Sequence, residues 1–191
     1  DPAQVLNLIA ELRPSLILLV PVTMQAVLQN ANWEKCDCSS LRSVTTGSSV
    51  IPVELIEGFH QRNIPVGQVY GSTETCPIAA YLRAEDAIRK IGSTGKTALH
   101  CEVRVVNESG KSVATGEAGE LLVRGANVMK EYWNNPDETA KVITDGWYST
   151  GDVGFYDEEG YLFINDRKRD IIISGSENIY PAEIEVVLRE H

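Results

Sequence analysis

Residues 16–21 read Leu-Ile-Leu-Leu-Val-Pro, an apolar run with the length of one strand that proline closes. A strand that is apolar at every position is typical of a parallel sheet covered by helices on both faces. Before this run, residues 2–12 carry apolar side chains on one helical face, and Asp1 can cap that helix. A helix followed by a buried strand favours an α/β layer.

The alternation of helix and strand continues up to about residue 70. The expected elements are, in order, a helix after Pro21, a strand over 43–46, a helix over 52–62 and a strand over 66–70. In the helix after Pro21, we expect Val22, Ala26 and Val27 to face inward. We therefore predict an N-terminal α/β subdomain with a parallel sheet over residues 1–90.

From about residue 91 the sequence predicts short strands. They are expected over 102–106, 120–124, 147–149, 153–156 and 161–164. Residues 157–160, Asp-Glu-Glu-Gly, fit a hairpin turn, and residues 135–138, Asn-Pro-Asp-Glu, fit the start of a short helix. We expect a β-rich, antiparallel subdomain, shaped as a distorted barrel, over residues 91–165.

The sequence finishes with a charged connector and the beginning of another domain. Residues 166–170, Asp-Arg-Lys-Arg-Asp, contain no apolar side chain and are expected to form a solvated hinge. A strand over 171–173, a turn at Gly175-Ser176 and a helix from Pro181 predict the start of a small α+β domain over 171–191. That helix has no stop signal before His191, so we expect the chain to be part of a longer protein.

Composition excludes several classes of protein. The chain has 191 residues, of which 43% are hydrophobic and 23% charged, as in ordinary globular proteins. With 17 basic and 27 acidic residues its formal charge is −10, which argues against nucleic-acid binding. No apolar run approaches the roughly 20 residues that cross a bilayer. Four cysteines without a CxxC pair favour reduced thiols in a cytoplasmic protein.

Residues 69–75, Val-Tyr-Gly-Ser-Thr-Glu-Thr, combine an aromatic ring, a glycine, hydroxyls and a carboxylate at the end of an expected strand. Gly71 lets a ligand approach the backbone, while Ser72 and Thr73 offer donors to an anion. Glu74 is an oxygen ligand suited to Mg²⁺. The same residues also fit a helix start, with a hydroxyl as N-cap and the carboxylate favoured by the helix dipole.

Two further stretches carry candidate binding groups. Residues 145–152, Asp-Gly-Trp-Tyr-Ser-Thr-Gly-Asp, place Asp152 after a glycine turn, where its anion can accept two strong hydrogen bonds from a ribose diol. Asp152 could equally cap that turn. In the charged connector, Arg167 is a fixed fork of donors for a ribose or phosphate oxygen, although a solvated charge run also explains it.

In order and spacing, these stretches resemble the motifs of the adenylate-forming (AMP-binding) superfamily, and most closely its acyl-CoA synthetase branch. The matching segments are residues 70–74 (the family's YGxTE), 119–125 (GELxxxG), 148–152 (YxTGD), and 166–170 with 174–185 (the hinge motif and its glycine loop). The resemblance covers essentially the whole chain. It implies an enzyme with ATP/AMP, Mg²⁺ and coenzyme A as its cofactors and co-substrates.

The resemblance also implies a reaction. A carboxylic acid attacks the α-phosphate of ATP to give an acyl-adenylate and pyrophosphate, and the thiol of coenzyme A then displaces AMP. We expect a fatty acid as the substrate. In the family, a Ser/Thr/Gly-rich phosphate loop precedes this segment and an adenylation lysine follows it, so we expect the 191 residues alone not to run the full reaction.

The family motifs imply a role for each matching residue. They are Thr73 on the α-phosphate, Glu74 on Mg²⁺, Asp152 and Arg167 on the ribose, Tyr70 against adenine, Gly71 and Ser72 among the cofactor-binding residues, Gly47, Ser48 and Ser49 lining the nucleotide and acyl pocket, and Arg169 as the pivot of the C-terminal domain. The family often has Gly-Gly-Ala at 47–49 and a second glycine at 176, which leaves the size and polarity of the pocket open.

Two other functions stay open: an adenylation module that loads the thiol of a carrier protein, and a non-catalytic nucleotide-binding module. A nicotinamide-dependent redox enzyme is disfavoured because no Gly-x-Gly-x-x-Gly follows a strand. A serine hydrolase is disfavoured because no Gly-x-Ser-x-Gly is present. The first subdomain is expected to expose an open sheet edge, and a second copy of the chain, forming a homodimer, is one way to cover it.

Overall fold

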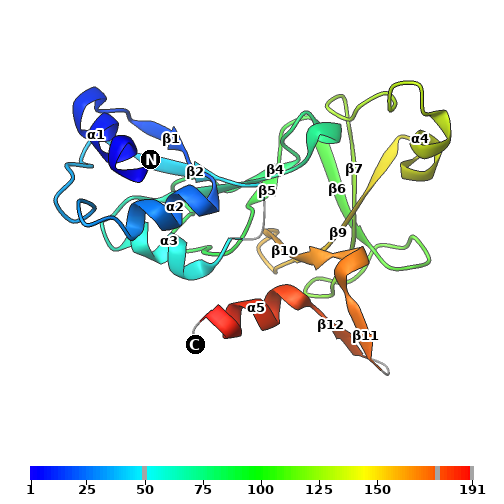
Figure 1. The fold of residues 1–191 in the computed structure, drawn as a ribbon. Coiled ribbons are helices and arrows are strands. Elements are labelled where there is room, and N and C mark those ends of the chain that lie inside the picture. Colours follow the sequence, from blue (N-terminus) through cyan, green and yellow to red (C-terminus); the bar gives the residue numbers. More distant parts are fainter. Residues whose placement is uncertain (49–50, 175–176, 190–191) are drawn as a thin grey trace. The chain divides into compact units, whose positions relative to one another are not determined.

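A computed structural model describes residues 1–48, 51–174 and 177–189 (Figure 1). It divides into two compact units, the first made of Asp1–Val69 and Leu82–Gly92, the second of Tyr70–Tyr81 and Ser93–His191. Within the described ranges, no helix is long and apolar enough to cross a membrane. The subdomain borders expected at residues 90 and 165 stay predictions.

The first unit is built on parallel strands. β1 (Leu16–Leu18) pairs with β2 (Ser43–Thr46), and β2 pairs with β3 (Val66–Tyr70), both in parallel. β2 and β3 begin and end where the sequence predicts, whereas β1 stops two residues before the predicted end. The α/β layer with a parallel sheet is thus confirmed.

Three helices complete the core of the first unit: α1 (Pro2–Leu12), α2 (Pro21–Leu28) and α3 (Val53–His60). α2 lies beside both α1 and α3 (Figure 1). Their inward side chains form one apolar cluster with the strands, and its members include Leu6, Ile9, Met24, Val27, Val44, Ile56, Phe59 and Val66.

The predicted inward face of α2 was wrong at one position. Val22 is 70% exposed, while Met24 and Val27 are fully buried. Two residues turn an α-helix by about 200°, so Val22 and Met24 point to opposite sides, and Met24 fills the core.

The second unit is a curled antiparallel sheet with the strand order β10-β9-β7-β6. Its strands are β6 (Cys101–Val106), β7 (Gly119–Gly125), β9 (Trp147–Tyr156) and β10 (Leu162–Arg167), and β8 (Ile143–Thr144) pairs with β9. Two short strands, β4 (Ala80–Tyr81) and β5 (Lys96–Thr97), pair antiparallel. Asp157 Oδ1 accepts hydrogen bonds from the amides of Glu159 and Tyr161, so the predicted hairpin turn is confirmed.

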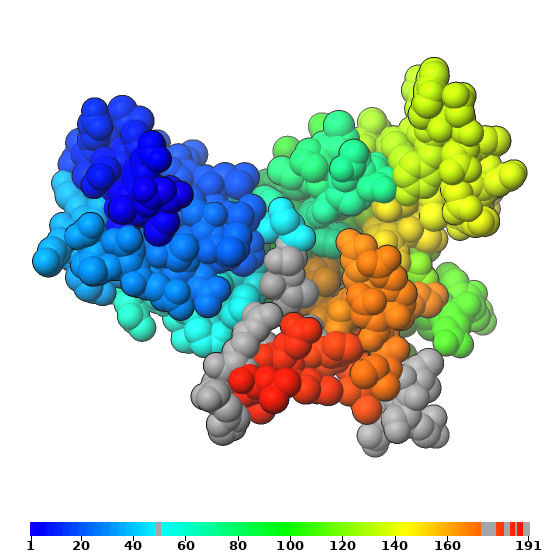
Figure 2. Space-filling model, viewed as in Figure 1, coloured from blue at the N-terminus to red at the C-terminus, as the bar shows by residue number. Residues whose placement is uncertain are grey.

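α4 (Pro136–Val142) begins as predicted, because the side chain of Asn135 accepts a hydrogen bond from the amide of Glu138. None of its residues is buried, and Figure 2 shows this helix, in yellow, at the surface. The apolar clusters of the second unit are small: one centres on Val105, Leu121 and Leu162, the other on Val123 and Tyr148.

The C-terminal part of the second unit has the predicted α+β character. A 3₁₀ turn, η2 (Lys168–Asp170), leads into an antiparallel pair, β11 (Ile172–Ser174) and β12 (Glu177–Ile179), and then into α5 (Pro181–Arg189). The turn expected at 175–176 lies outside the described residues. The fold class predicted from the sequence is confirmed for all three parts.

Candidate functional site

Asp152 projects from an irregular stretch of β9. The pairing of β9 with β7 shifts between Glu120 and Leu122, so residues 150–152 bulge out of the ladder. Thr150 holds the bulge, because its hydroxyl donates to the carbonyl of Leu121 (2.8 Å) and accepts from the amide of Asp152 (3.0 Å). Gly151 has φ +71°, a conformation that glycine adopts without strain. This bulge explains why the sequence predicted two strands where one is present.

The carboxylate of Asp152 has a partner at each oxygen. The Tyr70 hydroxyl donates to Oδ2 at 2.9 Å, and Arg167 Nε lies 3.4 Å from Oδ1. Burial raises the pKa of Asp152, although the Tyr70 hydrogen bond and the charges of Arg167 and Arg169 oppose it. Burial and the charge of Asp152 raise the pKa of Tyr70, so its hydroxyl stays protonated and able to donate.

A second bulge sets Arg167 opposite Asp152. In the pairing of β10 with β9, Ile164 faces Gly154 but Asp166 faces Val153, so Asn165 is an extra residue. If Asn165 instead paired with Val153 in a regular ladder, Asp166 would lie opposite Asp152, and like charges directly opposite each other are destabilising. The extra residue brings the guanidinium of Arg167 to that place instead.

The segment after Tyr70 folds into a single 3₁₀ turn, η1 (Thr73–Thr75). Ser72 occupies its N-cap position, and the Ser72 amide donates to the Thr75 hydroxyl at 2.9 Å. A Cβ on Gly71 would meet the carbonyl oxygen of Pro77 at 1.7 Å, so this position accepts no side chain. The close approach at Gly71 is therefore an approach of backbone to backbone.

Glu74 is oriented by Tyr132, a residue outside the sequence motifs. The Tyr132 hydroxyl donates to Glu74 Oε1 at 2.9 Å. Burial raises the pKa of Glu74, but hydrogen bonds, including those from its own amide and from Tyr132, and the charge of Arg167 outweigh burial, so the net pKa is lowered. Tyr132 matches none of the quoted motifs, and its only signal in the sequence is a tyrosine just before a capped helix.

Glu74 and Asp152 share one electrostatic neighbourhood. Burial raises the pKa of Tyr148, and both carboxylates raise it further, so Tyr148 lies within electrostatic range of each. The charge of Arg167 lowers the pKa of both carboxylates, although burial dominates at Asp152. Two residues nearly eighty positions apart in the sequence thus belong to the same site in the second unit.

The remaining predicted residues divide between the two units. Thr73 is exposed on η1. Arg169 is exposed on η2, with Nε 3.6 Å from the carboxylate of Asp170. Gly47 and Ser48 belong to the first unit, where Ser48 has φ +82°, a conformation that favours glycine. Ser49 lies outside the described residues.

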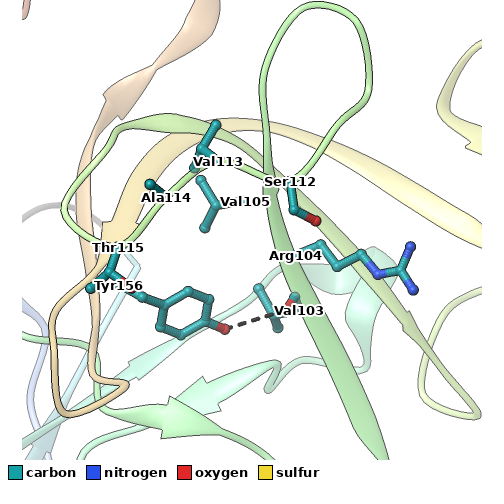
Figure 3. A pocket seen from close by; sticks show the side chains of 8 residues that line it. All are labelled: Val103, Arg104, Val105, Ser112, Val113, Ala114, Thr115 and Tyr156. Atoms are coloured by element: carbon teal, nitrogen blue, oxygen red, sulfur yellow. Dashed lines mark hydrogen bonds between the residues drawn. The ribbon is translucent and has the colours of Figure 1, made fainter.

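A cavity of about 200 Å³ lies along β6, outside this cluster (Figure 3). Its lining is Val103, Arg104, Val105, Ser112, Val113, Ala114, Thr115 and Tyr156. The lining contains no carboxylate, thiol or imidazole, and Arg104 is its one charged residue. This cavity therefore lacks the acidic groups that characterise the cluster around Asp152 and Glu74.

The donor set suits a cation shared with a ligand. Among the described residues, no three His, Cys, Asp or Glu side chains come together as a complete metal site. Mg²⁺ is usually held by one or two carboxylates together with phosphate oxygens and water. A single anionic carboxylate, Glu74, in range of Arg167 is compatible with that mode of binding.

Comparison with known proteins identifies the class. The model of the AMP-binding enzyme family matches residues 1–133, and the chain belongs to this family. The indoleacetate–CoA ligase of Aromatoleum aromaticum is 50% identical over 100% of this chain and 37% of its own length. The long-chain-fatty-acid–CoA ligase FadD13 of Mycobacterium tuberculosis is 40% identical over 98% of this chain and 37% of its own length.

Solved structures agree with this assignment. The o-succinylbenzoate CoA synthetase of Bacillus subtilis, in complex with its acyl-adenylate intermediate, has a TM-score of 0.90 and 38% identity. The match covers 100% of this chain and 39% of that structure. The chain thus spans somewhat more than a third of the length of these relatives. The relatives are named for three different acids, an indole acid, a fatty acid and an aromatic dicarboxylic acid, so the comparison does not identify one acid substrate.

Proposed function

We propose that the protein containing this chain is an AMP-forming acid–thiol ligase. It activates a carboxylic acid with ATP to an acyl-adenylate and transfers the acyl group to coenzyme A. The observation that carries this proposal is the cluster in the second unit, where Tyr70 and Arg167 contact Asp152 and the charge of Arg167 also acts on Glu74. The relatives named above, all CoA ligases, support it.

In this proposal, the cluster binds the two ends of one adenylate. Asp152 accepts hydrogen bonds from the ribose hydroxyls, because its anion is already fixed by Tyr70 and flanked by Arg167. The ring of Tyr70 lies against adenine, and Gly71 and Ser72 belong to the nucleotide site beside it. Thr73, exposed on η1, donates to the α-phosphate, and Arg167 assists Asp152 at the ribose.

Glu74 is the proposed magnesium ligand. When bound, Mg²⁺ would neutralise phosphate charge as the α-phosphate is attacked. A glutamate carboxylate is anionic at neutral pH, as a ligand to a hard cation must be, and the environment of Glu74 lowers its pKa further. One structure of the Bacillus subtilis synthetase is in complex with ATP and a magnesium ion, which supports this role.

The acid and the thiol acceptor are the finer parts of the proposal. A fatty acid is the substrate expected from the sequence, and FadD13 supports that choice, while the more similar indoleacetate–CoA ligase favours an aryl acid. Gly47, Ser48 and Ser49 are proposed to line the pocket for the nucleotide and the acyl group. Arg169 is proposed as the pivot between the two half-reactions.

The test is AMP release by the full-length protein with a panel of acids. Indoleacetate, ferulate, 2-succinylbenzoate and a long-chain fatty acid are each supplied with ATP and Mg²⁺, and coenzyme A is compared with a phosphopantetheinylated carrier protein. We expect acid-dependent AMP release that requires coenzyme A. Pyrophosphate exchange without transfer to coenzyme A would favour the carrier-loading module, and nucleotide binding without exchange would favour the non-catalytic one.

Self-association is proposed from the edge of the first unit. Leu16 and Leu18 of β1 are 63% and 67% exposed, and apolar side chains on an edge strand favour pairing with another strand. Light scattering on the 191-residue chain would measure its mass. A folded monomer would contradict the homodimer.

A further inference from the structure

The loop between β7 and α4, residues 126–132, holds the turn that carries Glu74. We call it the bracing loop. Asn127 Nδ2 donates to the carbonyl of Thr75 at 2.8 Å, and the amide of Met129 donates to the carbonyl of Glu74 at 2.7 Å. The Tyr132 hydroxyl donates to the Glu74 side chain at 2.9 Å. One loop therefore fixes both the backbone and the carboxylate of Glu74.

Tyr132 is itself held in place. Its amide donates to the Thr139 hydroxyl at 2.9 Å, and that hydroxyl donates to the carbonyl of Asn135, the N-cap of α4. The hydroxyl is thus a fixed donor aimed at one carboxylate oxygen.

The chemistry of this donor suits a metal ligand. A neutral hydroxyl orients a carboxylate without cancelling its charge, whereas a lysine or arginine in the same place would compete with a bound cation. The hydrogen bond engages Oε1, one of two carboxylate oxygens, each of which has more than one lone pair. Partners of this kind orient the ligands of metal sites and raise metal affinity.

We propose that Tyr132 is a positioning residue that presents the Glu74 carboxylate to the divalent cation bound with ATP. This inference rests on the proposed function, because it needs Glu74 to be the cation's ligand. It assigns a role to the bracing loop, which the sequence motifs leave without one. Removing the hydroxyl should weaken binding of the cation and leave binding of metal-free nucleotide unchanged.

The experiment measures ATP binding to the full-length protein by titration calorimetry, across a Mg²⁺ series and in EDTA. For Tyr132→Phe, we expect the Mg²⁺ concentration that gives half of the increase in ATP affinity to rise about tenfold. A tenfold loss is the lower end of what removal of a residue that orients a metal ligand causes. The affinity for ATP in EDTA should stay within about twofold. Tyr156→Phe is the matched control, because it removes a half-buried hydroxyl that pairs with Thr97 in the same unit. It should change neither quantity.

Glu74→Gln separates the inference from the function. Glu74→Gln should abolish the increase in ATP affinity that Mg²⁺ produces. The double variant with Tyr132→Phe should then bind ATP no more weakly than Glu74→Gln alone. If Glu74→Gln keeps the full Mg²⁺ effect, the proposed role of Glu74 fails. If Glu74→Gln loses the effect while Tyr132→Phe behaves like Tyr156→Phe, the positioning role alone is overturned.

A second variant covers the case in which Tyr132→Phe does not fold. Glu74→Asp keeps the charge but draws the carboxylate back by one methylene, away from the Tyr132 hydroxyl. We expect it to weaken Mg²⁺ binding about as much as Tyr132→Phe. Full Mg²⁺ affinity in Glu74→Asp would show that the hydroxyl is not needed and would overturn the proposal.

Discussion

The two units differ in how they use burial. The first buries one large apolar cluster drawn from three helices and parallel strands. The second has two small clusters and instead surrounds Asp152 and Glu74 with tyrosine side chains. Burial in the first unit mainly favours folding, whereas burial in the second also shifts the pKa of acidic groups. We therefore expect substitutions in the apolar core of the first unit to lower the free energy of unfolding, and substitutions around Asp152 and Glu74 in the second unit to lower activity.

The largest expected effect is on the core of the first unit. Phe59 is 1% exposed, and its ring centroid lies 4.9 Å from that of Trp33. Phe59→Ala should lower the free energy of unfolding by about 3–5 kcal/mol because it leaves a cavity. Amide hydrogen exchange should accelerate in residues 1–69 far more than in residues 101–167. Equal acceleration in both units would break the comparison. Leu12→Ala, at a position 68% exposed on α1, is the control.

The next effect is on activity without a loss of stability. If Asp152 binds the ribose, Asp152→Asn should slow ATP–pyrophosphate exchange about 100-fold, equivalent to about 3 kcal/mol. The melting temperature should hold or rise, because burial raises the pKa of Asp152 and so disfavours its anion in the folded state. Asp137→Asn, at an exposed position of α4, is the control and should leave both unchanged.

The same variant has a predicted pH dependence. A carboxyl whose pKa is raised on folding contributes stability below its ordinary value of 3.8, and this contribution is lost as the pH rises through the folded pKa. The melting temperature of Asp152→Asn minus that of the wild type should therefore increase between pH 4 and pH 7. A difference that decreases with rising pH would contradict the raised pKa.

A smaller gain is expected at Ser48. Its φ of +82° costs a non-glycine residue about 1 kcal/mol, and glycine relieves that cost. Ser48→Gly should raise the melting temperature, whereas Ser48→Ala, which keeps a Cβ, should not. If both variants behave alike, the hydroxyl and not the backbone decides this position.

The smallest effect is a pH dependence in the first unit. His60 Nε2 accepts a hydrogen bond from the Val66 amide at 3.2 Å, and burial lowers the pKa of His60, although Glu57 opposes this. Stability is full above the ordinary pKa of 6.5 and is lost as the pH falls through the lowered folded pKa. His60→Gln should reduce the dependence of the melting temperature on pH in this range, while His100→Gln in the second unit should not.

The sequence was sufficient where local pattern decides structure. β2 and β3 were predicted to the residue, because short runs rich in β-branched or aromatic residues end at turn-forming residues, Gly47 after β2 and Gly71 after β3. The start of α4 was predictable because Asn135 caps it through its own side chain. The inward face of α2 was not, since both Val22 and Met24 are apolar and only the packed core distinguishes them.

The site was less predictable than the fold because its geometry depends on cross-strand register. The bulges at residues 150–152 and at Asn165 set Arg167 opposite Asp152, and no local pattern reveals which residue a strand will leave unpaired. Tyr132 was missed for a related reason. Its partner, Glu74, is 58 positions earlier in the chain, so only the folded structure joins them.

The fit of Gly71 against the Pro77 carbonyl affects how related sequences should be compared. An invariant glycine there would reflect the path of the main chain and would be retained even in family members that have lost catalysis. The acids at 74 and 152 are free of that steric restriction. If Glu74 and Asp152 act as proposed, their presence in a relative is thus the better guide to whether it still adenylates.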